Sequence, residues 1–347
     1  MPYVPKGSRI LVTGANGFIA VWLVRSLLEQ GYSVRGTVRS MAKGTYLTNM
    51  FKQYGDKFEI IIVEDLTIDG AFNDAVKGID AIEHCASPVI FNADNPKDII
   101  EPAVQGTLGI LRSAKNAPQL KRIVILESIA SIIRDADGPL VFSENDWNDQ
   151  ALDEVERLGR NASGLAKYRA SKTLAERAAW DFHKECKNQV NWDLVTVNPP
   201  YVFGPAIHEV SSPGGLNAST KAWYDAVVAR GESSKLPVID GNSWVDVRDL
   251  GLGLVKSLEV KEAGGERIIV CGGRFFWQDW RNIAKSLAPS PILSPAPGTE
   301  QAIGDSDMRI YKITLDTSKE KRILGLTYRT KEEVTRDILA DFERRGW

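Results

Sequence analysis

The sequence has few cysteines, a net charge close to zero and no long apolar run. Its three cysteines, Cys85, Cys186 and Cys271, are an odd number at wide spacing, which favours reduced thiols over a disulfide framework or a metal site. The 43 basic and 45 acidic residues leave a net charge of −2, so no overall field draws the chain to nucleic acid or to an anionic membrane. A small neutral molecule is the partner that this balance favours.

No stretch reaches the roughly 20 apolar residues that a membrane-spanning helix needs. The segment from Met1 to Ser8 has no basic residues followed by an apolar run, so we expect no export signal and a cytoplasmic location. With 347 residues, 43% hydrophobic and 25% charged, the chain has the composition of a globular protein. Its length suits one large α/β unit or two closely packed domains.

Short β-rich runs alternate with segments of helical periodicity along the chain. The predicted buried strands are Arg9 to Thr13, Ser33 to Val38, Phe58 to Val63, Asp80 to Cys85, Arg122 to Leu126 and Asn191 to Val197. The predicted helices include Gly17 to Gln30, Pro96 to Ala117, Leu165 to Glu185 and Lys331 to Arg345. This alternation indicates parallel βαβ units, so we predict an α/β fold with a doubly wound parallel sheet of the Rossmann type.

Prolines and glycines gather after the last of these strands and indicate a change to irregular structure. We predict that residues 1–197 form a dinucleotide-binding domain, to which 237–257 return. Residues 198–236 and 258–347 are predicted to form a smaller, mostly C-terminal substrate-binding part. Within it, Ala288 to Gly304 contains four prolines and is expected to be a surface loop.

A glycine-rich turn follows the first predicted strand and opens the first predicted helix. The segment Gly14 to Ala20 reads GANGFIA, so backbone N–H groups at the start of the helix can face a pyrophosphate. Glycines also occur in ordinary turns, and it is the order strand, glycine, helix that favours a nucleotide site. The cofactor contacts predicted in this turn are Gly14, Asn16, Gly17, Phe18 and Ile19.

The end of the second predicted strand distinguishes between the two nicotinamide dinucleotides. NAD enzymes usually carry a carboxylate there, whereas this chain has Arg39, with Lys43 beyond it. A guanidinium can pair with a 2′-phosphate through two hydrogen bonds, so NADPH/NADP+ is favoured, with a solvated arginine as the alternative. Asp65, followed by Leu66, is placed to accept a hydrogen bond from the adenine amino group, and a loop-capping aspartate is an equally good interpretation.

Tyr168 and Lys172 are spaced by four residues near the start of a predicted helix, which puts a phenol and an ammonium on one face. Carbonyl reduction needs a proton at oxygen as hydride reaches carbon, and a neighbouring cation makes a phenol a better donor. The spacing occurs by chance, but Tyr168 is the only one of nine tyrosines with a lysine four residues later. Ser128 follows the fifth predicted strand, where its hydroxyl can hold the carbonyl beside Tyr168.

With these residues in place, the chain resembles the extended short-chain dehydrogenases/reductases. Within them it is similar to the fungal aldehyde and ketone reductases related to methylglyoxal reductase and plant dihydroflavonol reductase. The resemblance covers nearly the whole length and is carried by Val12 to Ala20, His84 to Pro88, Phe142 to Asn148, Val197 to Pro205 and Asp246 to Asp249. It implies a Rossmann fold and NADPH-dependent reduction of a carbonyl compound.

The resemblance also implies further contacts. It assigns Ala86 and Ser87 to a loop beside the cofactor, Pro199 and Val202 to the nicotinamide side, and Ser219 to the diphosphate. Substrate contacts are expected from loops over the sheet and from the second part of the chain, although plain packing is an equally good interpretation of apolar residues. The candidates are Val89, Phe91, Ile129, Tyr201 and Trp223. Such a pocket suits an apolar or aromatic carbonyl compound.

One position departs from the pattern of these reductases. They usually read Thr-Ser-Ser where this chain has Leu126, Glu127 and Ser128, so the serine is kept but a carboxylate precedes it. Neighbours in an extended segment point to opposite sides, so we expect Glu127 to avoid the substrate. An anion buried near the cofactor would instead alter the proton chemistry or lower the stability.

We therefore predict a carbonyl reductase in which Tyr168 donates the proton, Lys172 holds the nicotinamide ribose and Ser128 orients the carbonyl. A nucleotide-sugar epimerase or dehydratase of the same fold is an alternative, and it would favour an acidic residue in place of Arg39. An NADPH-binding regulator without turnover is a second alternative, suggested by Glu127. Either a monomer or a homodimer is compatible with the sequence.

Overall fold

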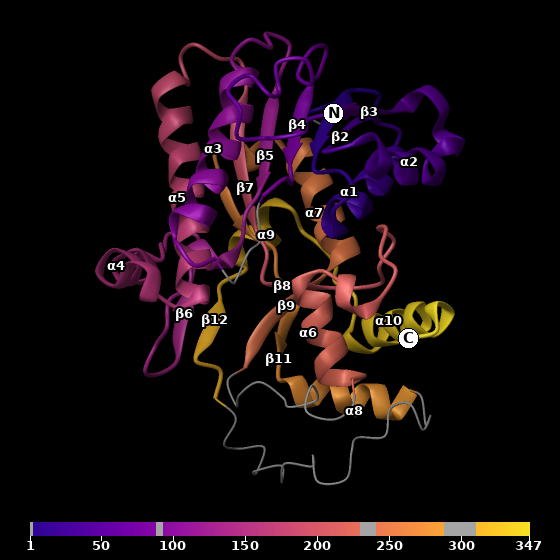
Figure 1. Ribbon diagram of the computed structural model, residues 1–347, viewed down its shortest axis with the longest axis vertical. Helices are drawn as coiled ribbons and strands as arrows, with labels where there is room; N and C mark the ends of the chain where they lie inside the picture. Colours follow the sequence, from indigo (N-terminus) through magenta and orange to yellow (C-terminus); the bar gives the residue numbers. More distant parts are fainter. Residues whose placement is uncertain (1–2, 88–92, 230–240, 288–309) are drawn as a thin grey trace.

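A seven-stranded parallel sheet forms the centre of the computed structural model, which describes residues 3–87, 93–229, 241–287 and 310–347 (Figure 1). In spatial order its strands are β10 (Arg267–Ile269), β7 (Asp193–Asn198), β5 (Arg122–Leu126), β4 (Ala81–His84), β1 (Arg9–Thr13), β2 (Ser33–Val38) and β3 (Phe58–Ile62). Each neighbouring pair is parallel. The prediction of a doubly wound α/β sheet is confirmed.

Helices cover both faces of this sheet, because its strands carry apolar side chains on both sides. They are α1 (Phe18–Glu29), α2 (Met41–Met50), α3 (Lys97–Ala114), α5 (Gly164–Cys186) and α7 (Val247–Glu259). Ile10 and Val12 of β1 pack into one apolar core with α1 and α7, whereas Leu11 packs into the other with α3 and α5. Among the described residues, no helix has the length and apolar character needed to cross a bilayer.

The order of the strands reverses between β1 and β4. The chain runs from β1 outward to β2 and β3 and then crosses to β4, on the other side of β1. Open sheets of this kind bind ligands in the crevice at the carboxyl ends of the strands where the order reverses. Thr13 and His84, the last residues of β1 and β4, are paired at this point.

A smaller layer lies beyond the carboxyl ends of the strands, in the lower half of Figure 1. It contains the three-stranded sheet β11 (Gly273–Phe275), β9 (Asn242–Asp246) and β8 (Tyr201–Phe203), with helices α6 (Ala218–Val227), α8 (Trp277–Leu287) and α10 (Lys331–Arg345). Its core is aromatic: Trp280 meets Phe203 and Trp223 with ring centroids 5.4 and 6.2 Å apart. The remaining elements are β6 (Leu140–Phe142), α4 (Asp149–Leu158), β12 (Ile313–Leu315) and α9 (Ser318–Ile323), and β6 pairs with β12.

The strands do not follow the predicted division of the chain at two places. β10 falls in 258–347, which the sequence assigns to the substrate-binding part, yet it pairs with β7 as the edge strand of the large sheet. β9 falls in 237–257, predicted to return to the large domain, yet it pairs with β8 and β11. Strands of three to five residues carry too little periodicity to reveal their partners. The loop predicted at 288–304 lies outside the described residues.

Candidate active site

Two adjoining cavities occupy the crevice at the carboxyl ends of the strands. The larger has a volume of about 490 Å³ and the smaller about 320 Å³. Both are lined by Gly14, Gly17, Cys85 and Ser87, so they form one continuous cleft over the switch from β1 to β4. A cleft of this shape and position suits an extended ligand such as a dinucleotide.

The glycine-rich turn brings the backbone close to the floor of the cleft. Gly14 has a φ of +62°, and a Cβ at this position would lie 3.1 Å from the backbone of Ala86. Gly17 precedes the first residue of α1 and has no side chain to cover the N–H groups of the first helical turn. Gly14, Asn16 and Gly17 line the smaller cavity, and Phe18 and Ile19 line the larger one. The turn therefore offers free space and positive helix-end dipoles at the place where a diphosphate would lie.

Thr13, which the sequence analysis does not single out, holds the loop after β4 in place. Its hydroxyl oxygen accepts hydrogen bonds from the backbone N–H groups of Cys85 and Ala86, at 3.1 and 3.0 Å. The same hydroxyl is 2.9 Å from His84 Nδ1. Burial lowers the pKa of His84 to about 3, with a smaller effect of the Lys172 charge in the same direction, so this imidazole is neutral. Ala86 and Ser87 thereby line the cleft from a loop fixed to β1.

The smaller cavity is basic at its outer end. Arg39 and Lys43 both line it, and Lys43 forms an exposed ion pair of 3.2 Å with Glu209. Leu66 is also in the wall. Asp65 is engaged in its own loop, where its Oδ1 accepts hydrogen bonds from the backbone N–H and the hydroxyl of Thr67, at 2.8 and 2.6 Å. For Asp65 the contacts thus support the loop-capping alternative.

Tyr168, Lys172 and Ser128 line one wall of the larger cavity. Tyr168 and Lys172 lie near the N-terminus of α5, which Ser163 caps by accepting the N–H of Ala166. The Lys172 ammonium is buried and donates a hydrogen bond of 2.9 Å to Ser87 Oγ. Burial acts to lower its pKa, but the charges of Glu127 and Tyr168 outweigh burial, and the net pKa is raised.

Ser128 stands at the turn that follows β5. Its Oγ accepts the N–H of Ala130 at 3.1 Å, and its carbonyl oxygen accepts hydrogen bonds from Ser131 Oγ and Asn198 Nδ2, at 2.8 and 3.3 Å. The backbone at Ser128 is therefore held from two directions, and Ser128 lines the same cavity as Tyr168.

Glu127 does not avoid the cavity, contrary to expectation. Its carboxylate lies 3.6 Å from Lys172 Nζ, an ion pair beyond hydrogen-bonding distance, and it is part of the cavity lining. Side chains alternate between the two faces along β5, and this explains the direction of Glu127. Ile125 packs on the side of the sheet that α3 and α5 cover, so Glu127, two residues later, faces α5 as well. Burial raises the pKa of Glu127 to about 7, against the opposing effect of the Lys172 charge.

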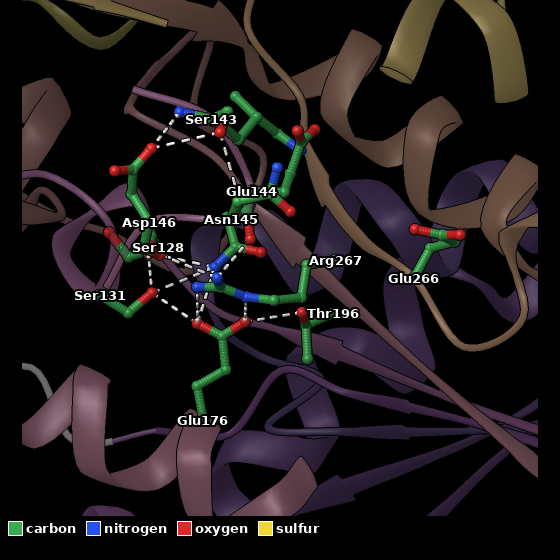
Figure 2. A network of polar contacts seen from close by, with 12 residues as sticks. Ser128, Ser131, Ser143, Glu144, Asn145, Asp146, Glu176, Thr196, Glu266 and Arg267 are labelled. Carbon is green, nitrogen blue, oxygen red and sulfur yellow. Dashed lines mark hydrogen bonds and ion pairs between the residues drawn. The ribbon is translucent and has the colours of Figure 1, made fainter. Parts of the chain in front are cut away.

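A buried polar network ties the end of β5 to α5, β7 and β10 (Figure 2). In this Glu176 network, the carboxylate of Glu176 accepts hydrogen bonds from Ser131 (2.5 Å), Thr196 (2.7 Å), Asn198 (3.0 Å) and Arg267 (2.8 Å). Burial acts to raise the pKa of Glu176, but the Arg267 charge and these hydrogen bonds outweigh burial and lower the pKa. The carboxylate is thus a fixed anion on the buried face of α5. Sequence reasoning missed it, although its spacing of eight from Tyr168 places it on the same helix face.

Arg267 extends the network to the segment before α4. Its guanidinium donates to the carbonyl oxygens of Glu144 and Asp146, at 2.5 and 2.9 Å, and lies 3.7 Å from the centre of the Trp147 ring. Figure 2 shows Arg267 between this segment and Glu176. The side chain therefore carries no free hydrogen-bonding face toward the cleft and holds the surrounding backbone in position.

Of the residues expected to contact the cofactor or the substrate, some line the larger cavity and others do not. Pro199, Val202 and Ser219 line the larger cavity, together with Pro200 of the segment from Val197 to Pro205. Leu216, Asn217 and Ala218 also line it, and no sequence motif indicates these three. Tyr201 is 38% exposed on β8, and Ile129 packs toward a small apolar cluster; neither is in the cavity lining.

The prediction for Trp223 is wrong. Its side chain is fully buried between Trp280 and Phe342 in the aromatic core of the smaller layer, because the apolar face of α6 packs inward. Val89 and Phe91 lie outside the described residues.

Comparison with known proteins identifies the family of the chain. The model of the NAD dependent epimerase/dehydratase family matches residues 10–272. The chain belongs to this family. Among similar family relatives, ketoreductase azaE of Aspergillus niger is 36% identical over 328 residues, covering 92% of this chain and 93% of that protein. NADPH-dependent methylglyoxal reductase GRE2 of Saccharomyces cerevisiae is 33% identical over 344 residues, covering 94% and 96%.

A solved structure extends the likeness to the whole fold. The crystal structure of Gre2 in complex with NADPH from Candida albicans superposes with a TM-score of 0.86 at 31% sequence identity. The match covers 99% of this chain and 100% of that chain. The epimerase/dehydratase family includes proteins of different activities, so the residues of the cleft have to distinguish among them.

Proposed function

We propose that the protein is an NADPH-dependent reductase of aldehydes and ketones. The observation that carries the proposal is the joint presence of Ser128, Tyr168 and Lys172 in one wall of a cleft whose other end is basic. Relatives named as ketoreductase and as methylglyoxal reductase support the same reaction class. We further propose that it acts in the cytoplasm, which agrees with its unpaired cysteines. We also propose that it is a monomer or a homodimer.

The cleft has the features that an NADPH molecule requires. The glycine turn at the start of α1 leaves the N–H groups of the first helical turn uncovered for the diphosphate, because Gly17 has no side chain. Arg39 and Lys43 can hold the 2′-phosphate at the end of the smaller cavity. Lys172 can hold the nicotinamide ribose in the larger cavity. The similarity to a structure of Gre2 in complex with NADPH favours the same cofactor.

Three side chains would carry the reaction. NADPH supplies the hydride that reaches the carbonyl carbon. Tyr168 gives its phenol proton to the carbonyl oxygen as the negative charge develops there, and the Lys172 ammonium stabilises the phenolate that remains. Ser128 donates a hydrogen bond to the same oxygen and fixes its distance from Tyr168. The carbonyl compound is thereby reduced to an alcohol, and a solvent proton restores the phenol.

The assay that tests this function follows NADPH consumption by absorbance against aldehydes, diketones and aryl ketones. We expect turnover with several members of the panel, and a lower kcat/KM with NADH than with NADPH. Binding of NADPH without oxidation across the whole panel would favour a regulator instead. An epimerase or dehydratase of the same fold would keep a dinucleotide bound through purification, so a protein that retains NAD(H) would contradict the proposal.

A further inference from the structure

Glu127 is a buried carboxyl group in the larger cavity for which the reaction above has no use. Its side chain is 2% exposed, and its Oε2 lies 3.6 Å from the Lys172 ammonium. Within the described part of the chain, this oxygen has no hydrogen-bond partner. A buried carboxylate oxygen without a hydrogen-bond partner lowers the stability of the fold unless an opposite charge lies nearby, and Lys172 supplies that charge.

We propose that Glu127 is a positioning residue of the reductase, which acts through Lys172 and sets how readily Tyr168 gives up its proton. The inference rests on the proposed carbonyl reduction. Glu127 directly precedes Ser128, and Lys172 follows Tyr168 by one helical turn, so all four side chains line the same cavity. A charge on Glu127 therefore acts on the place where the phenolate must form.

Burial and the charged groups around Glu127 together bring its pKa close to neutral pH. Its own pKa of about 7 results from burial, partly offset by Lys172. From α5, the Glu176 carboxylate also faces it and stays ionised because Arg267 of β10 pairs with it. From β4, burial keeps His84 neutral by lowering its pKa to about 3. Glu127 thus changes its charge at a pH where these neighbours do not.

The sign of the effect follows from the charge that the reaction creates. Hydride leaves NADPH for the carbonyl carbon, the phenol proton goes to the oxygen, and Tyr168 is left as a phenolate beside Lys172. An ionised Glu127 repels this phenolate and shares the Lys172 charge, whereas a protonated Glu127 does neither. Reduction should therefore be faster when Glu127 is protonated, below about pH 7.

The kinetic test compares the pH profile of kcat/KM for the carbonyl substrate, at saturating NADPH, in the natural protein and in Glu127→Gln. In the natural protein we expect a fall on the order of tenfold from about pH 6 to about pH 8. In Glu127→Gln, which is neutral at every pH, we expect the rate to stay within about twofold of its value at acidic pH. Glu127→Asp restores a titrating carboxyl group and should restore the fall.

A matched control is Glu144→Gln. Glu144 is also a buried glutamate, and its Oε1 accepts the N–H of Ile269, a contact that glutamine can keep. It lines neither cavity, so this variant should keep the fall with pH. Circular dichroism and thermal unfolding would establish that each variant is folded.

A second measurement needs neither cofactor nor turnover. Infrared difference spectra of the protein alone, recorded across neutral pH, should show a protonated carboxyl band that titrates near pH 7 and is missing in Glu127→Gln. In Lys172→Met the band should persist to higher pH, because the cation that favours ionisation is gone. This readout remains informative even if no variant of Glu127 is stable.

The outcomes separate this inference from the proposed function. An unchanged pH profile in Glu127→Gln, or a uniform loss of rate with the same profile, would overturn the role of Glu127 while leaving the reductase in place. A missing carboxyl titration in the infrared spectra would also overturn it. If no carbonyl compound is turned over, the proposed function fails, and the infrared titration then decides whether the Glu127 and Lys172 pair exists.

Discussion

Tyr168, Lys172 and Ser128 line the same cavity because the start of α5 and the end of β5 both face it. The backbone at Ser128 is held through its carbonyl oxygen by Ser131 and Asn198. Lys172 is held by Ser87 and faces Glu127. Ser128 and Lys172 are thus placed by groups on separate elements, so the proposed chemistry of this cavity can be tested one side chain at a time.

Replacement of Tyr168 by phenylalanine should remove the proton donor without changing the cleft. We expect kcat/KM for carbonyl reduction to fall by about 10³-fold, since general acid catalysis contributes on the order of 10² to 10⁴. The Kd of NADPH, measured by fluorescence titration, should change by less than about twofold.

Tyr224→Phe is the matched control for Tyr168. Tyr224 packs against Phe342, with ring centroids 5.3 Å apart, and lines neither cavity. Its variant should keep full activity. Retained turnover in Tyr168→Phe would refute the assignment of the proton donor.

Arg39 should determine the preference for the phosphorylated dinucleotide. Arg39→Ala removes a bidentate partner of the 2′-phosphate, so kcat/KM with NADPH should fall about tenfold or more, while the value with NADH changes little. Arg25→Ala, which removes an exposed pair with Glu29 and a contact with the Trp22 ring on α1, is the control. If the ratio of the two values is the same in both variants, another group binds the phosphate.

The sequence predicts where a residue lies when the local conformation of the main chain alone determines its place. Gly14 and Gly17 follow a strand and open a helix, so their place in the cleft follows from local sequence. Trp223 and Glu127 were misjudged for a different reason. The pattern of an amphipathic helix such as α6 shows that one face is buried but not what packs against it. The alternation of side chains along a strand shows that Glu127 points to the side opposite Leu126, but not that α5 lies on that side.

Helix α5 carries Tyr168, Lys172 and Glu176 at successive spacings of four, so one face serves both the cavity and the interior. Glu176 anchors the end of that face to β7 and β10 through Thr196 and Arg267. Because the same carboxylate also binds Ser131, the helix and the turn that bears Ser128 are held by one group.

Loss of the Glu176 charge should therefore destabilise the protein and loosen the site. Glu176→Gln leaves the buried Arg267 guanidinium without its anion, and we expect a loss of about 3 kcal/mol in the free energy of unfolding. Urea denaturation would measure it. Glu29→Gln, which breaks an exposed pair with Arg25, should cost less than about 0.5 kcal/mol. Equal effects of the two changes would contradict a structural role for the network.

The large sheet was predictable element by element, and the smaller layer was not. β1, β2 and β5 have the predicted bounds, because each is a buried run between turn signals. β8 and β11 have three residues each, and their pairing with β9 joins segments far apart in the chain. No local pattern encodes such pairings, so the aromatic core that they cover could not be foreseen.

The interior of the sheet should make the stability of the molecule depend on pH. Glu83 of β4 is fully buried, and burial raises its pKa well above its usual value, against the smaller effect of Arg122. The native state therefore holds a proton that the unfolded chain releases above its ordinary pKa near 4.5. The stability that Glu83 contributes is then complete below that pH and declines as the pH rises toward the native pKa.

Glu83→Gln should weaken this dependence. Urea denaturation at about pH 5 and about pH 8 should show a smaller loss of unfolding free energy in the variant than in the natural protein, by more than about 0.5 kcal/mol. Glu144→Gln again serves as a comparison. An identical pH dependence with and without Glu83 would mean that this carboxyl group is not protonated in the native state.

Strand β10 lies far behind its partner β7 in the chain, which affects the protein while it is being synthesised. β7 is made well before its neighbour β10, and the chain between them builds β8, α6, β9 and α7. While a ribosome is still adding that stretch, the growing chain presents an unpaired strand edge, which is the kind of surface that captures other nascent chains. We therefore expect that edge to be exposed to other chains until residue 269 has emerged from the ribosome.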